Sequence, residues 1–205
     1  NKDFFNILGT GGGKSPHSVF VQKAIQEGKR EPLWEERFDA KGYRHYSIRW
    51  YIPKGQTDAY MANNTVVVGM DTSEAVGRDS ITMVGINPKT LDTVFAFNIN
   101  ETNVIRFCNF VAELMVRWDK MVIIPEHKST GVALVDSLLL VLPSKGINPY
   151  KRIFNLALQE ADSDRDRYQA AVTGRYTSEE LEKSKRLFGY ITSSGGAYSR
   201  NNLYV

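Results

Sequence analysis

The stretch that decides the fold is TVVVGMD, residues 65–71, an apolar run that ends in an acidic residue. A continuous apolar run of this length predicts a strand that is buried on both faces of a sheet. Two further stretches, SITMVGINP (80–88) and TVFAFNIN (93–100), also predict strands, and a short turn joins them. The sequence therefore predicts three successive antiparallel strands.

The chain after residue 100 alternates between helix and strand patterns. The apolar residues of NVIRFCNFVAELMVRW (103–118) recur at helical spacing, and KMVIIPE (120–126) predicts a fourth strand that again ends in an acid. STGVALVDSLLLVLP (129–143) predicts a second helix that ends before its proline, and RIFNLAL (152–158) a fifth strand. This order predicts an α/β fold, with a mixed sheet (three antiparallel strands, then β-α-β-α) and helices on both faces.

The chain before residue 65 gives weaker signals. HYSIRWYI (45–52) alternates as a strand does, whereas PKGQTDAYMANN (53–64) has the composition of a linker. GTGGGKS (9–15) is similar to a phosphate-binding loop, but that motif requires glycine where Leu8 stands. We interpret GTGGGKS as a glycine-rich turn between a strand and a helix.

Composition limits the classes of function. Of 205 residues, 42% are apolar and 24% charged, which is ordinary for a globular protein, and no apolar run is long enough to span a membrane. The single cysteine, Cys108, excludes an internal disulfide, and with only three histidines a Cys/His zinc cluster is excluded as well. The net charge of +3 is compatible with a polyanionic partner.

Two acids that end strands are the strongest candidates for chemistry. Asp71 ends the first strand and Glu126 the fourth, and in this order of elements the first and fourth strands are commonly neighbours. Two adjacent carboxylates repel each other unless a cation lies between them, and Mg²⁺ or Mn²⁺ prefers such oxygen ligands. Asp79 is a possible auxiliary ligand, with Glu74 near it. The alternative for Asp71 alone is a structural bond that caps the following turn.

The surroundings of this pair suit phosphate chemistry. His127 and Lys128 follow Glu126 directly, and Gly131 allows a close turn into a helix whose N-terminus favours anions. Two metals held here would activate in-line displacement at a phosphodiester. Basic residues that could hold a nucleic-acid backbone, or simply form a solvated face, are Lys145, Lys151, Arg152, Lys183, Lys185 and Arg186.

VVVGMDTSEAVGRDSITMVGI, followed by VIIPEHKSTGVALVDSL, resembles the C-terminal nuclease domain of the large terminase subunit of tailed bacteriophages. The resemblance implies an RNase H-like fold over residues 61–205, with Asp71, Glu126 and Asp79 as ligands of Mg²⁺ or Mn²⁺, of which Asp71 and Glu126 are catalytic. It also implies a third essential acid near the C-terminus, which the chain lacks, so we expect a piece truncated at that end. Other RNase H-like nucleases, namely resolvases and DDE transposases, share strand-end acids, and a DNA-gripping module with an incomplete site is the non-enzymatic alternative.

The resemblance also assigns the remaining features. It implies that residues 1–60 are the end of an ATPase domain and a linker. It also implies that ATP is bound only by a domain upstream of this chain. The implied partners are double-stranded DNA, the portal protein and the small terminase subunit, with no membrane. The expected location is the cytoplasm of the host cell, where the nuclease would cut concatemeric DNA at the start and end of packaging.

Overall fold

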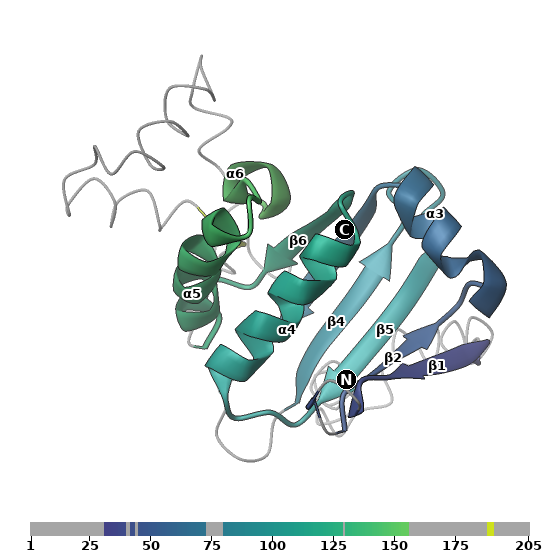
Figure 1. The fold of residues 1–205 in the computed structure, drawn as a ribbon, viewed down its shortest axis with the longest axis horizontal. Helices are drawn as coiled ribbons and strands as arrows, with labels where there is room; N and C mark the ends of the chain where they lie inside the picture. Colours follow the sequence, from purple (N-terminus) through teal and green to yellow (C-terminus); the bar gives the residue numbers. More distant parts are fainter. Residues whose placement is uncertain are drawn as a thin grey trace, which may run out of the picture. The chain divides into compact units, whose positions relative to one another are not determined.

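A six-stranded mixed sheet forms the centre of the described structure (Figure 1). The computed structural model of the protein describes residues 31–39, 42–43, 45–72, 80–128, 130–155 and 188–190. Its strands are β1 (Trp34–Arg37), β2 (Ser47–Trp50), β3 (Val66–Asp71), β4 (Ile81–Ile86), β5 (Thr93–Ile99) and β6 (Met121–Pro125). Its helices are η2 (Lys54–Gln56), α3 (Thr57–Asn63), α4 (Val104–Arg117), α5 (Thr130–Ser144) and α6 (Pro149–Arg152).

The strands lie in the order β1-β2-β5-β4-β3-β6. All neighbours are antiparallel except β3 and β6, which are parallel. The α/β class, the meander of three antiparallel strands and the pairing of the first predicted strand with the fourth are confirmed. Two strands from before residue 60 extend the sheet beyond β5, and the sequence predicted only one of them, β2.

One face of the sheet is buried and the other is partly open. Burial alternates along β3, where Val66, Val68 and Met70 are buried but Gly69 and Asp71 are exposed. On the buried face, the rings of Phe107 and Phe110 in α4 contact Phe97 of β5, and α5 lies beside α4 (Figure 1). The prediction that β3 is buried on both faces is therefore wrong, and α4 covers only one face.

The predicted linker at 53–64 is instead mostly helical. Residues 54–56 form η2 and residues 57–63 form α3, and Thr57 and Met61 are only 2% and 1% exposed. The turn-forming residues of this stretch gave no sign of a helix. An isolated helix of this length is unstable, so the burial of Thr57 and Met61 stabilises it.

The C-terminal predictions hold only in part. α5 runs through Pro143 to Ser144 instead of ending before the proline, so that Pro143, which has no N–H to donate, lies in the last turn. The strand predicted at 152–158 begins as α6 and continues only as isolated bridges at Ile153 and Asn155. Residues 156–158 and 9–15 lie outside the described residues.

None of the described helices could cross a membrane. The longest, α5, has 15 residues and is about 22 Å long, shorter than the hydrocarbon core of about 30 Å.

Residue 85 of β4 has to be glycine because the ring of Phe95 covers it. It pairs with Phe95 of β5, and a Cβ at residue 85 would overlap the Phe95 ring, which also contacts Trp50 and Trp118. Because the Phe95 ring is fully buried, it cannot move away from the added Cβ. We expect Gly85→Ala to lower the free energy of unfolding by about 1–3 kcal/mol, measured by urea denaturation. Gly69→Ala is the control, since a Cβ there meets nothing within 4 Å; equal stability of the two variants would contradict the steric explanation.

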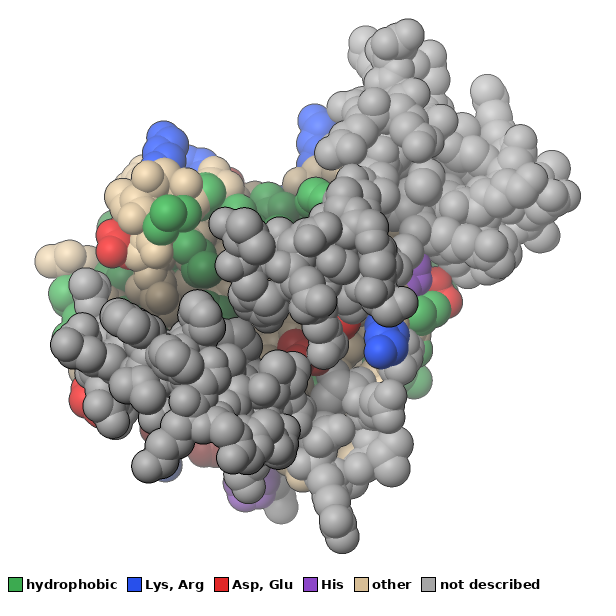
Figure 2. Space-filling view, turned by 180° about the vertical axis from the view of Figure 1, so that it is seen from behind, with side chains coloured by type: hydrophobic (Ala, Val, Ile, Leu, Met, Phe, Trp, Pro, Cys, Tyr) green, Lys and Arg blue, Asp and Glu red, His purple; other side chains and the backbone are tan. Residues whose placement is uncertain are grey.

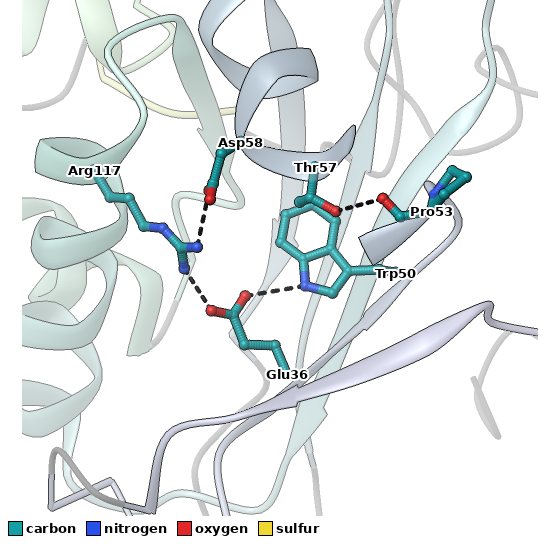
Figure 3. Close-up of polar contacts among 6 residues, drawn as sticks. All are labelled: Glu36, Trp50, Pro53, Thr57, Asp58 and Arg117. Atoms are coloured by element: carbon teal, nitrogen blue, oxygen red, sulfur yellow. Dashed lines mark hydrogen bonds and ion pairs between the residues drawn. The ribbon is translucent and has the colours of Figure 1, made fainter. Parts of the chain in front are cut away.

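Arg117, at the end of α4, connects the first strands to the rest of the fold (Figure 3). Its guanidinium donates to Glu36 of β1 at 2.6 Å and to Asp58 of α3 at 3.0 Å. Glu36 also accepts a hydrogen bond from the Trp50 indole at 3.1 Å. Burial by itself lowers the pKa of Arg117, but Glu36 and Asp58 more than compensate and raise it above its usual value. The network therefore holds β1, β2 and α3 against α4.

We expect Arg117→Met to destabilise the protein by about 1–2 kcal/mol, because it leaves the largely buried Glu36 carboxylate without its cation. The Glu36 side chain is only 19% exposed. Asp58→Asn is the matched control: the Asp58 side chain is 80% exposed, so we expect at most about 0.5 kcal/mol. Thermal unfolding at low and high salt measures both, and an effect of Asp58→Asn as large as that of Arg117→Met would contradict this prediction.

Candidate metal centre

Asp71 and Glu126 lie next to each other at the carboxyl ends of β3 and β6. These strands are parallel, and Met70 is paired with Pro125. The backbone N–H of Glu126 donates to the carbonyl oxygen of Met70 at 3.0 Å, which continues the pairing by one residue. The backbones of Asp71 and Glu126 are thus separated by about 4.8 Å, one strand spacing.

Both carboxylates are on the open face of the sheet. Side chains alternate along a strand, and Met70 and Pro125 are directed to the buried face. Asp71 is exposed and Glu126 is half-buried. The structure therefore brings the two predicted ligands together on a side of the sheet that is accessible to water and to a substrate.

Gly131 places the start of α5 against this pair. A Cβ at residue 131 would collide with the backbone carbonyl oxygen of Glu126 and would lie 3.0 Å from the hydroxyl of the buried Thr72. Only glycine allows this approach. The partial positive charge of the helix N-terminus consequently lies beside Glu126, where it favours anions.

Residues 188–190 flank the other side of Glu126, a contact that the sequence did not indicate. Tyr190 pairs with Glu126 in a parallel bridge, through hydrogen bonds from Tyr190 N to Pro125 O and from His127 N to Tyr190 O, both 2.8 Å long. Gly189 has a positive φ of 82° and closely approaches Pro125.

The other predicted residues divide into three groups. Asp79, Glu74, Lys183, Lys185 and Arg186 lie outside the described residues, so their roles stay predictions. Lys128, Lys145 and Lys151 are exposed, as a nucleic-acid contact requires, and His127 is half-buried.

Arg152 has a structural role instead. Its guanidinium donates to the carbonyl oxygens of Met115, Trp118 and Met121 at 2.6–2.8 Å, which satisfies the C-terminal end of α4. The prediction that Arg152 contacts DNA is wrong, because these bonds occupy its charged group.

The pair provides part of a metal site. Among the described residues, no group of three or more His, Cys, Asp and Glu side chains could hold a metal ion. Two carboxylates nevertheless suit Mg²⁺ or Mn²⁺, since these ions commonly bind one or two carboxylates and complete their coordination with water and phosphate oxygens. The donor set therefore fits a hard divalent cation that a substrate phosphate shares.

No protein-family model matches this chain, and no curated protein matches it either. What the site can do therefore has to follow from its geometry.

Proposed function

We propose that this chain carries the RNase H-like nuclease domain of a large terminase subunit and is a divalent-metal-dependent DNA endonuclease. The observation that carries the proposal is the placement of Asp71 and Glu126 in register at the carboxyl ends of two adjacent parallel strands, on the open face. Two carboxylates at this spacing are well suited to a divalent cation that is shared with phosphate.

The arrangement of strands supports the same proposal. An RNase H-like domain needs a meander of three antiparallel strands, then a helix and a strand beside the first strand of the meander. β3, β4 and β5 form such a meander, and β6 follows α4 and lies beside β3. β1 and β2 are additions at the β5 edge.

The residues of this chain would hold the metal ion and orient the substrate phosphate. Asp71 and Glu126 would hold the metal, with Asp79 as an additional ligand. A bound Mg²⁺ or Mn²⁺ would polarise the phosphodiester and lower the pKa of an attacking water. The start of α5, fixed by Gly131 against Glu126, would favour the negative charge of the substrate phosphate.

The remaining parts of the proposal come from the resemblance. In the whole protein, this domain would cut concatemeric double-stranded DNA when packaging begins and ends. ATP would bind the upstream domain. Its protein partners would be the portal protein and the small terminase subunit. It would act in the cytoplasm of the host cell.

Nicking of supercoiled plasmid tests the proposal. We expect the chain to convert supercoiled DNA to open-circular and linear forms with Mn²⁺ or Mg²⁺ and to be inactive with EDTA. The same assay on a version extended beyond Val205 tests the effect of a third acid. If neither version cuts DNA with either metal, the nuclease proposal is wrong. Binding of DNA without cutting would then favour the DNA-gripping alternative.

A further inference from the structure

A single row of polar side chains crosses the open face of the sheet and ends at the acid pair. Cross-strand partners share a face, and the pairs Arg37↔Ser47, Thr82↔Asn98 and Asp71↔Thr82 are directly opposite. The pairing of Ile48 with Phe97 places Ser47 opposite Asn98. From one edge of the sheet to the other, the row consists of Arg37, Ser47, Asn98, Thr82, Asp71 and Glu126.

This row is accessible. Arg37, Asn98 and Asp71 are exposed, and Ser47, Thr82 and Glu126 are half-buried. In the neighbouring row, Gly69 and Ala96 have little or no side chain to block an approaching ligand, and Val84 is 39% exposed. Figure 2 views the molecule from this side, and acidic side chains are visible near its centre.

Two arginines give the far end of the row a positive charge. Arg37 is in the row itself, and Arg49 is on the same face in the next row, opposite Glu35. Glu35 lies 3.6 Å from Arg37, but these side chains are 40% and 72% exposed, so this ion pair is weak and can exchange for a phosphate. After that exchange, two guanidinium groups are available for phosphate oxygens.

The distances from the arginines to the acid pair span several nucleotides of a nucleic-acid backbone. Arg37 is four strands from Asp71 and Arg49 is three, which corresponds to about 19 Å and about 14 Å at about 4.8 Å per strand. Because a DNA strand advances about 3.4 Å per nucleotide along the duplex, these distances correspond to about four to six nucleotides from the acid pair. The Thr82 hydroxyl and the Asn98 amide between them can donate to phosphate or sugar oxygens, and the Ser47 hydroxyl, which is hydrogen-bonded to Glu35, can do so once Glu35 is displaced.

We propose that this row is the track on which the DNA backbone lies, with Arg37 and Arg49 gripping phosphates about four to six nucleotides from the scissile bond. The proposal rests on the proposed function for the direction of the track, which leads to Asp71 and Glu126. It adds a role for β1 and β2, the two strands outside the predicted nuclease meander.

Binding to a 30-base-pair duplex, measured by fluorescence anisotropy in EDTA, tests the track without any cutting. We expect the double variant Arg37→Ala, Arg49→Ala to raise Kd about tenfold at about 0.1 M salt and to reduce the salt slope of log K by about 2, since two phosphate contacts are lost. Asn98→Arg adds a cation in the middle of the row. It should lower Kd and increase the slope by about 1.

The control is Arg106→Ala, on α4 at the opposite face. Arg106 is 53% exposed and lies 3.8 Å from Glu101, so, like Arg37, it is an exposed arginine with an acidic neighbour. Equal losses for Arg106→Ala and the double variant would overturn the track, and so would unchanged binding of the double variant or of Asn98→Arg. Failure of the nuclease proposal has a different signature, because it is a loss of cutting in the metal-containing plasmid assay.

Discussion

Asp71→Asn should reduce Mn²⁺-dependent plasmid nicking at least about a hundredfold, the largest change in activity that we expect from a single substitution. The variant keeps the size and the position of the side chain but removes the charge of one of the two proposed metal ligands. A catalytic metal contributes several kcal/mol to a phosphoryl-transfer step, and about 1.4 kcal/mol corresponds to a tenfold change in rate.

The same variant should not lose stability in the absence of metal. Asp71 is exposed, and asparagine has nearly the same size and shape, so the substitution leaves the packing around it unchanged. We expect the wild-type Tm to rise when Mn²⁺ is added, since a ligand that binds only the folded state stabilises it. This rise should be much smaller for Asp71→Asn, which separates loss of metal binding from loss of folding.

Asp92→Asn is the control for charge alone. Asp92 is an exposed acid in the turn between β4 and β5, at the end of the sheet opposite to the acid pair. The Asp92→Asn variant should cut DNA as the wild-type chain does. An Asp71→Asn variant that nicks plasmid at the wild-type rate would show that Asp71 is not a ligand of the catalytic metal.

The neighbouring acids were predictable because they depend on local pattern and simple topology. An apolar run that ends in an acid indicates both the strand and its end: Asp71 is the last residue of β3, and Glu126 directly follows β6. A meander followed by a helix and a strand leaves few positions for that strand, and the one beside the first strand was correct.

The features that were missed depend on contacts between distant parts of the chain. β1 has the sequence WEER, in which charged residues conceal the alternation of inward and outward positions. Glu36 occupies an inward position only because Arg117 and the Trp50 indole satisfy its carboxylate. Likewise, nothing near Glu126 in the sequence indicates that Tyr190 lies beside it.

The apolar run of β3 was also misleading in one respect. Three consecutive valines suggested burial on both faces, yet Val67 is only half-buried and Gly69 is exposed. β-branched residues favour a strand on either face, so the run determined the element correctly but not the number of faces that are covered.

Gly131→Ala should have the largest effect on stability, a loss of about 2–4 kcal/mol. An alanine in the first turn of a helix normally stabilises it by up to about 1 kcal/mol relative to glycine, so the sign of the expected effect is opposite to helix propensity. The reason is steric: the new Cβ would overlap the backbone carbonyl oxygen of Glu126, and a backbone atom at a strand end has little freedom to move.

Gly131→Ala should lower both the thermal stability of the protein and its rate of DNA nicking. At about 2–4 °C per kcal/mol for a chain of this size, we expect Tm to fall by about 4–16 °C. Relief of the overlap has to separate α5 from Glu126, so nicking with Mn²⁺ should fall even at temperatures where the variant is fully folded. Val132→Ala, one residue further along, is the matched control, because this valine is 39% exposed and its truncation creates no overlap. If Gly131→Ala is as stable and as active as Val132→Ala, then α5 does not press against Glu126, and the proposed contribution of the helix N-terminus to phosphate binding is wrong.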